Sequence, residues 1–312
     1  MICMERRRFP VVIGGPTASG KTRLAIEVAL FLQKEFGLQA EIINADSVQM
    51  YRDLKILTAY PSEEELKQVK HNLYGILDAH ELSNVVSWLE KARSHIDRIK
   101  KEGKVAIICG GTGFYIKAIM NGISDIPKVP DDFRKNVLAR FGKIGRDAFF
   151  EELFAIDRYS YQTLNKNDTQ RILRAYVIAS FTGKPLSEWW KTSQKMNYDA
   201  LSFILLPNKE EIHARSASRI LQMIQKGAIE EVSEFNKRYP NYNGPLCNVI
   251  GYKEISENAS VDEIHIRTKQ YIKRQSTWFR NQMKFAKFLH GFGDNKEILD
   301  KVCKYITILD NI

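Results

Sequence analysis

The sequence predicts an α/β fold: a parallel sheet flanked by helices, interrupted by an all-helical insertion and completed by a helical C-terminal region. Two patterns predict it. Short apolar runs alternate with longer amphipathic stretches up to about residue 126 and return after residue 200, which is typical of βα units. Between these parts the period is helical, without a strand-like run. We therefore expect one domain formed by 1–126 and 201–312, and a helical insertion at 127–200.

The predicted strands are short apolar runs, and the predicted helices are the amphipathic stretches between them. The strands are expected at 9–15 (FPVVIGG), 40–46 (AEIINAD), 104–111 (KVAIICGG), 201–206 (LSFILL) and, as a last edge strand, 305–309 (YITIL). The helices are expected from Lys21 to about Phe36 with Gly37 as the residue that ends it, over 85–101, from near Gly113, through 131–190, and over 209–290.

The composition is that of an ordinary globular protein, with 312 residues, 44% hydrophobic and 27% charged. No apolar run reaches the roughly 18 residues that a membrane span needs, and the N-terminus has no apolar stretch of signal-peptide length. We therefore expect a cytoplasmic protein without a membrane partner. The cysteines form no C-x-x-C pair and the histidines no H-x-x-x-H pair, so a metal site built from these residues is not expected.

The strongest local signal is a glycine-rich loop that matches G-x-x-x-x-G-K-[ST] between a predicted strand and a predicted helix. It consists of Gly15, Pro16, Thr17, Ala18, Ser19, Gly20, Lys21 and Thr22. In such a P-loop the backbone N–H groups and the helix N-terminus bind phosphate. Lys21 would contact the phosphate oxygens, and the Thr22 hydroxyl would ligate a Mg²⁺ that bridges them. The motif predicts a di- or triphosphate site but no particular reaction.

Two common P-loop functions lack their other parts. A kinase or NTPase usually has a carboxylate at the end of a neighbouring strand, whereas the run at 104–109 ends in Cys109-Gly110-Gly111-Thr112. A GTPase would use the N-K-x-D string at 165–168 (NKND), but this string follows a helical segment and not a buried strand. We expect Asp168 to be the N-cap of the next helix instead.

Five further segments accompany the loop in order along the chain. They are NADSVQMY (44–51), GGTGFY (110–115), DTQRILRA (168–175), IGYK (250–253) and KRQSTWFR (273–280). Together with GPTASGKT they resemble the tRNA dimethylallyltransferase (tRNA isopentenyltransferase) family, over residues 10 to 290. The chain has Lys253 where an arginine can occur in the family, which affects only the fine recognition of the substrate.

The resemblance implies transfer of a dimethylallyl group from dimethylallyl diphosphate to N6 of the adenosine next to the anticodon (position 37) of tRNA, with Mg²⁺ and release of diphosphate. The adenine amine must lose a proton, and Asp46, at the end of a strand, is the candidate base; its alternative role is to cap the turn at 47–49. Lys21, Thr112 and the family arginine Arg219 would stabilise the leaving diphosphate. Arg219 shares a helix face with Arg215, and the alternative is that both are surface arginines.

The resemblance also implies contacts with the anticodon stem-loop. The residues concerned are Asp46, Ser47, Val48, Gln49, Arg134, Gln170, Arg171, Ile172, Leu173, Arg174, Gly251, Tyr252, Lys253, Lys273, Arg274, Gln275, Trp278 and Arg280. The stretch 265–290, with seven Lys or Arg and no Asp or Glu, suits phosphate contacts, although it would also suit a solvated helix face. Trp278 is either a stacking surface or a core residue.

Three other functions fit the sequence less well than this one. An adenylate isopentenyltransferase would not need the helical insertion or the acid-free basic stretch, because its acceptor is small. A small-molecule kinase would need the missing strand-end carboxylate, and an inactive RNA-binding module would not need Asp46, Lys21 and Thr112 to converge. We expect a monomer, and we expect the target base to leave its stack to reach the site.

Overall fold

The computed structural model describes residues 9–191 and 200–310. The chain packs as two compact units, one formed by Met1–Met120 with Asn197–Ile312 and the other by Asn121–Met196. The boundaries expected from the sequence, after residues 126 and 200, differ from these by six and four residues. Two stretches lie outside the described residues: residues 1–8, to which the expectation about a signal peptide refers, and residues 192–199 of the expected insertion.

The first unit contains a six-stranded parallel sheet with the order β3-β2-β4-β1-β5-β6. The strands are β1 (Val11–Gly14), β2 (Ala40–Asn44), β3 (Lys70–Asn72), β4 (Val105–Gly110), β5 (Leu201–Leu205) and β6 (Lys287–Leu289). The central strands are almost entirely apolar because helices cover both of their faces. Since Gly14 pairs with Gly110, and Asn44 with Cys109, the carboxyl ends of β1, β4 and β2 meet at one edge of the sheet.

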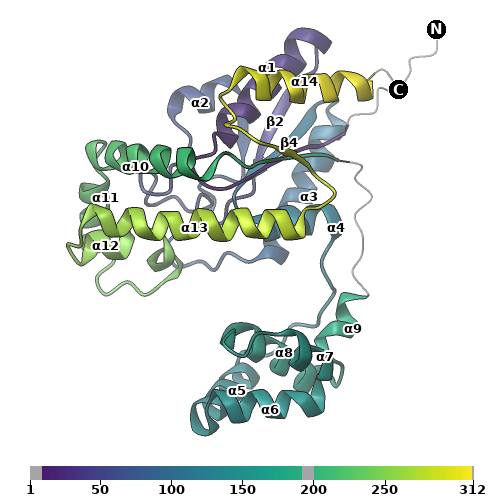
Figure 1. The fold of residues 1–312 in the computed structure, drawn as a ribbon, viewed down its shortest axis with the longest axis vertical. Helices are drawn as coiled ribbons and strands as arrows, with labels where there is room; N and C mark the ends of the chain where they lie inside the picture. The colour runs from purple at the N-terminus through teal and green to yellow at the C-terminus, as the bar shows by residue number, and fades with distance from the viewer. Residues whose placement is uncertain (1–8, 192–199, 311–312) are drawn as a thin grey trace. The chain divides into compact units, whose positions relative to one another are not determined.

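Helices cover both faces of this sheet (Figure 1). On one face, α1 (Lys21–Phe36) and α14 (Lys296–Asp310) pack on the strands through residues such as Leu24, Ile26 and Val302. On the other face, β1 approaches α4 (Gly113–Asn121) and α13 (Val261–Gln282), because a Cβ at Gly14 would meet Ile116 and Phe279. The remaining helices of this unit are α2 (Glu63–Gln68), α3 (Val85–Lys101), α10 (Lys209–Gln225), α11 (Ala228–Arg238), the 3₁₀ helix η1 (Pro245–Asn248) and α12 (Tyr252–Ser256).

The second unit is helical throughout its described part, as expected. Its helices are α5 (Asp131–Ile144), α6 (Arg146–Ile156), α7 (Arg158–Thr163), α8 (Thr169–Thr182) and α9 (Leu186–Trp190). It has its own core, in which Phe149, Leu153, Ile172 and Ile178 are fully buried. Within 9–191 and 200–310, no helix is both long enough and apolar enough to cross a membrane.

The structure confirms the four main predicted strands and corrects the C-terminal part. The edge strand predicted at 305–309 is wrong: these residues belong to α14, whose buried residues Ile298, Val302 and Ile306 recur every four positions, as on one face of a helix. The edge strand is instead β6, inside the stretch expected to be helical. The short elements α2 and β3 were not predicted, because they consist mainly of polar residues.

Candidate functional site

The P-loop connects β1 to α1 along a tightly constrained path. Ala18 and Gly20 both have positive φ values, 63° and 83°. A Cβ at Gly20 would lie 2.9 Å from the backbone nitrogen of Gly293, and the Gly293 N–H donates to the Ser19 carbonyl oxygen at 2.9 Å. The loop between β6 and α14 therefore packs against the P-loop through Gly293 and supports it. The first N–H groups of α1, which begins at Lys21, have no partner within the helix and could therefore bind an anion.

Lys21 lies over its own loop. Its ammonium donates to the Pro16 carbonyl oxygen at 2.7 Å. Burial lowers the pKa of Lys21 to about 8, and the nearby Asp46 carboxylate opposes this shift. An ammonium held in a partly dehydrated place interacts more strongly with a phosphate than one in bulk water would.

Asp46 follows β2 in a turn that Asn44 fixes from both sides. The Asp46 N–H donates to the Asn44 side-chain oxygen at 2.8 Å, and the Asn44 amide donates to the Asp46 carbonyl oxygen at 2.9 Å. Asp46 Oδ1 accepts from the Val48 N–H at 3.1 Å, so the expected turn cap is present. Burial raises the pKa of Asp46, and Lys21 opposes the shift. The cap uses Oδ1, while Oδ2 lies toward Gly111, only 3.1 Å from where a Cβ would stand.

Thr112, which precedes α4, joins the Asp46 turn. Its Oγ1 accepts from the Ser47 N–H at 3.0 Å and contacts the Ser47 hydroxyl at 3.3 Å. Its N–H donates to the Ala45 carbonyl oxygen at 3.1 Å. These bonds place Thr112 at the carboxylate end of the site, directly beside Ser47.

Arg219 and Arg215 lie on α10 and have different surroundings. Arg219 Nη1 donates to Thr17 Oγ1 in the P-loop at 3.4 Å, and burial lowers its pKa. Arg215 instead forms a bidentate ion pair with Asp294 at 2.8 and 2.9 Å and lies over the Phe292 ring. The interpretation of both as plain surface arginines is wrong for Arg219, which reaches the P-loop.

Helix α13 contacts the site through buried and half-buried residues. Gln275 is buried and bonds to Thr17 and Gly111. Trp278 is half-buried over Gly113, where a Cβ would collide with its ring, so it packs against the start of α4. The exposed cations of this helix, which we call the α13 basic cluster, are Lys273, Arg274 and Arg280.

Known proteins resemble this chain over most of its length. The family model described as IPP transferase matches residues 49–282. The chain belongs to the IPP transferase family. It is 37% identical over 290 residues to the tRNA dimethylallyltransferase of Pelagibacter ubique, with 90% of this chain and 91% of that protein covered.

Solved structures support the same family and fold. The tRNA delta(2)-isopentenylpyrophosphate transferase of Staphylococcus epidermidis is 31% identical, with a TM-score of 0.65 over 96% of this chain and 99% of that chain. A eukaryotic dimethylallyltransferase acting on tRNA, 24% identical, shares the fold with a TM-score of 0.78 over 96% of this chain and 77% of that chain.

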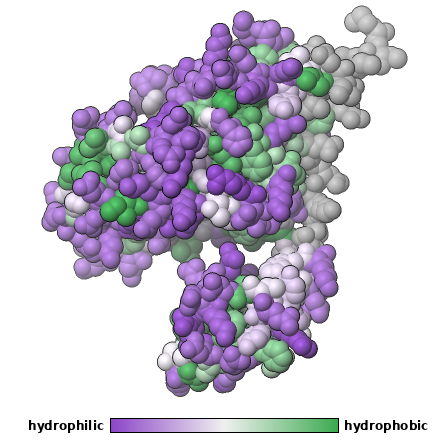
Figure 2. Space-filling view, viewed as in Figure 1, coloured by the Kyte–Doolittle hydropathy of each residue, from purple (hydrophilic) through white to green (hydrophobic). Residues whose placement is uncertain are grey.

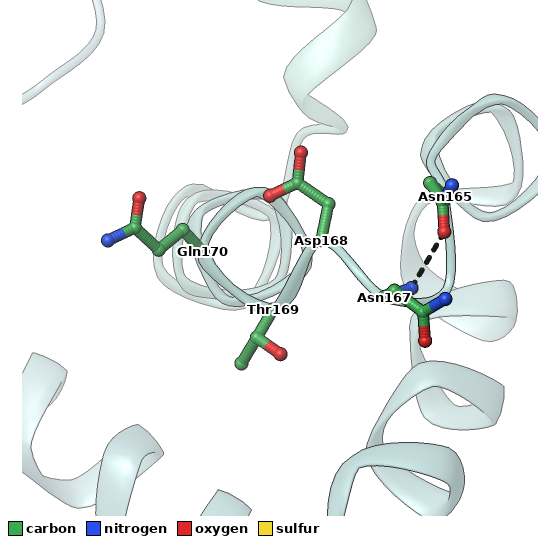
Figure 3. Close-up of a pocket in the computed structure, with 5 residues that line it drawn as sticks. All are labelled: Asn165, Asn167, Asp168, Thr169 and Gln170. Carbon is green, nitrogen blue, oxygen red and sulfur yellow. Dashed lines mark hydrogen bonds between the residues drawn. The ribbon is translucent and has the colours of Figure 1, made fainter. Parts of the chain in front are cut away.

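Most of the residues that the family resemblance assigns to tRNA in the second unit lie on its surface. Arg134, Gln170, Arg171 and Arg174 are exposed, whereas Ile172 is fully buried and packs in the unit's core. A hollow with a volume of about 500 Å³ lies at the start of α8 (Figure 3). It is lined by Asn165, Asn167, Asp168, Thr169 and Gln170.

The hollow in Figure 3 is not a guanine site. Asp168 accepts from the Arg171 N–H at 3.2 Å, which confirms it as the N-cap of α8. The N-K-x-D string is therefore the loop that enters a helix, as the sequence indicates.

The other predicted contacts surround the loop that follows Asp46. Gln49 donates to the carbonyl oxygens of Thr58 and Ala59 at 3.1 and 2.8 Å, and Val48 is part of the Asp46 turn. Gly251, with φ of 98°, starts α12 and donates to the Glu254 carboxylate at 2.9 Å. Tyr252 is buried and Lys253 is exposed.

Sequence reasoning missed four contributors to the site. Asn44 could have been found from the sequence, because it is a polar residue at the end of an apolar strand. The Gly293 support of the P-loop and the bridging role of Gln275 depend on contacts between distant segments, for which the sequence carries no local signal. Tyr271, one turn before Gln275 on α13, is the fourth: burial raises its pKa, and the Asp46 carboxylate adds to the shift.

Proposed function

We propose that this chain transfers a dimethylallyl group from dimethylallyl diphosphate to N6 of adenosine 37 in tRNA and releases diphosphate. The observation that carries the proposal is that the half-buried Asp46 carboxylate and the P-loop that contains Lys21 both border Gly111, at the carboxyl ends of the central strands. A phosphate cradle next to a base suits a reaction in which one partner loses a diphosphate and the other a proton.

In the proposed step the N6 nitrogen forms a bond to C1 of the allylic group while the bond between C1 and the diphosphate oxygen breaks. The diphosphate keeps the electron pair, and the amine proton passes to Asp46. Oδ2 is the candidate acceptor, since Oδ1 caps the turn through Val48. The raised pKa of Asp46 makes its carboxylate a stronger base than an exposed one.

The P-loop would bind the diphosphate. Lys21, Arg219 and the N-terminal N–H groups of α1 are the donors that would stabilise its growing charge. A Mg²⁺ fits the oxygen donors present here. Thr22 stands in the first turn of α1, and the Ser19 Oγ is buried without a hydrogen-bond partner among the described residues. Thr22 and Ser19 would hold the metal, which would supply positive charge to stabilise the leaving diphosphate.

Each unit has exposed cations that would contact the tRNA. Arg134, Arg171 and Arg174 of the second unit and the α13 basic cluster are accessible for phosphate contacts. Hydrophilic residues cover much of the visible face of each unit, between smaller hydrophobic areas (Figure 2). A net charge of +10 agrees with an RNA partner. We propose that the enzyme acts in the cytoplasm as a monomer.

The direct test is incubation with total tRNA and dimethylallyl diphosphate, followed by mass analysis of the nucleosides. We expect a dimethylallyl gain on adenosine that depends on tRNA. Transfer to free adenylate but not to tRNA would contradict the proposal and favour the adenylate enzyme.

The base is tested by Asp46→Asn, which keeps the oxygen that caps Val48 and removes the basic carboxylate. We expect kcat to fall by roughly 10²–10⁴-fold, with both substrates bound within a few-fold. Single-turnover kinetics and a thermal melt on one preparation decide between the two roles. If the variant lost only about 1 kcal/mol of stability and stayed active, Asp46 would be a turn cap and not the base.

A further inference from the structure

Gln275 makes two hydrogen bonds that connect distant parts of the site. Its Oε1 accepts from the Thr17 N–H at 2.9 Å, and its Nε2 donates to the Gly111 carbonyl oxygen at 2.9 Å. The two backbone partners fix the orientation of the amide, because one is a donor and the other an acceptor. The side chain is only 6% exposed. Gln275 therefore connects α13 to the P-loop and to the end of β4.

The packing around this amide leaves no room for adjustment. A Cβ at Gly111 would lie 2.7 Å from Gln275 Nε2. Three residues later on the same helix, Trp278 covers Gly113 so closely that a Cβ there would overlap its ring. Helix α13 is thus held against the β4–α4 turn at two points, of which only Gln275 also reaches the P-loop.

The two bonded groups belong to opposite ends of the site. Thr17 is the P-loop residue whose hydroxyl contacts Arg219, at the diphosphate end. Gly111 precedes Thr112, whose hydroxyl binds the turn next to Asp46, at the acceptor end. A shift of the Gln275 amide would change the distance between the phosphate cradle and the carboxylate. Misplacement by about 1 Å can cost a reaction 10²-fold in rate.

We propose that Gln275 is a positioning residue that fixes the P-loop at Thr17 relative to the Gly111–Thr112 turn and so sets the separation of the two substrates. This inference rests on the proposed function. It differs from the tRNA contact that the family resemblance implies for Gln275, because both polar atoms of its side chain are engaged within the protein.

The test compares Gln275→Met with Gln270→Met. The first replacement keeps the length of the side chain and removes both bonds, and the second changes an exposed glutamine of the same helix. We expect Gln275→Met to lower the single-turnover rate at saturating substrates by roughly 10–100-fold. It should weaken inorganic pyrophosphate binding in calorimetry about 10-fold and leave the tRNA Kd within about 3-fold. Gln270→Met should match the parent enzyme in all three measurements.

Gln275→Glu provides a rescue experiment and a second variant if methionine impairs folding. A protonated carboxyl group offers one donor and one acceptor, as the amide does, whereas the carboxylate offers only acceptors. The ratio of variant to parent rate should therefore rise as the pH falls from 8 to 5.5. A merely structural role would change the melting temperature but not this ratio.

Three outcomes would overturn the inference, and a fourth would overturn only the proposed function. A large loss of tRNA affinity with an unchanged saturated rate would return Gln275 to the RNA interface. A lower melting temperature with unchanged rate and pyrophosphate affinity would make it purely structural. If the parent enzyme failed to modify tRNA at all, the proposed function would fall. The pyrophosphate titration would still decide the positioning role, because equal affinity in Gln275→Met and parent would refute it.

Discussion

Replacing the P-loop lysine should stabilise the free protein while it abolishes diphosphate binding. The pKa of Lys21 falls from 10.5 to about 8 because the ammonium is partly removed from water. At neutral pH this difference corresponds to about 3 kcal/mol that the folded state loses by keeping Lys21 charged. Lys21→Met removes this penalty. The attraction of the Asp46 carboxylate is already included in the lowered pKa, so we expect a net gain of about 3 kcal/mol.

The pH dependence of the folding stability tests independently whether the charged Lys21 destabilises the folded protein. Between pH 8 and 10.5 the unfolded chain still holds the Lys21 proton, whereas the folded protein has released it. Because the unfolded state binds more protons in this window, stability should rise with pH there and stay level below it. Lys21→Met should lack this rise. Denaturant melts at pH 7, 8, 9 and 10 would measure both effects.

Two further variants sharpen the result. Lys34→Met alters a lysine of the same helix whose side chain is 83% exposed, and it should change neither the stability nor its pH dependence. Adding Asp46→Asn to Lys21→Met removes the carboxylate that is left without its cation and should raise the stability further, because burial disfavours that charge. If Lys21→Met were no more stable than the parent at pH 7 and kept the alkaline rise, the ammonium would be solvated and the reasoning refuted.

Other parts of the molecule yield three more predictions. Gly293→Ala would place a Cβ 2.3 Å from the Gly20 carbonyl oxygen, so it should raise the KM for the diphosphate at least several-fold. The control Gly142→Ala, in open space on α5, should leave the KM unchanged. An equal KM in both variants would show that Gly293 does not support the P-loop. Replacing all three members of the α13 basic cluster by glutamine should flatten the slope of log K against log[salt] for tRNA binding, by about 0.7–0.9 for each phosphate that is no longer neutralised. Pyrophosphate binding should stay unchanged. An unchanged slope would place the RNA site elsewhere. Glu41→Gln, at the amino end of β2, should cost about 3 kcal/mol with unchanged KM, because it breaks a buried ion pair with Arg98 and Lys104. Burial raises the pKa of Glu41, but these partners outweigh it and hold it at about 2, so the parent, unlike the variant, should lose this stability as pH falls from 4.5 toward 2.

The parts of the fold that the sequence predicted are those that local patterns determine. The P-loop, the central strands and the Asp168 cap each depend on neighbouring residues, and each is found where expected. The C-terminal region was harder to predict. In β6 only three residues pair with the sheet, too few for a period of two to show. The run YITIL is rich in β-branched residues, but it lies in a helix that packs against α1 and contacts Phe203 of β5 through Tyr305.

In the candidate site, too, some features could be predicted from local sequence motifs and others depend on contacts between distant segments. The identities of Lys21, Asp46 and Thr112 follow from motifs, because each chemistry needs a particular residue type. The contacts that hold them in place come from distant segments. Gln275 is 258 residues from its partner Thr17, and Gly293 supports a loop near the other end of the chain. Such contacts leave no periodic trace, so only the folded structure reveals which glutamine or glycine matters.

The absence of a carboxylate at the end of β4 gains a physical reason from the structure. The residue there, Gly111, stands between the two ends of the site: its Cβ would lie 3.1 Å from Asp46 Oδ2 and 3.6 Å from the Gly15 carbonyl oxygen. Any side chain at this position would stand between Asp46 and the P-loop. The acid therefore comes from β2, one strand further from the P-loop, and the glycine keeps the path between them open. A transferase that must bring two substrates together needs this space, whereas an NTPase, which binds a metal ion next to its phosphates, can place the carboxylate on the adjacent strand.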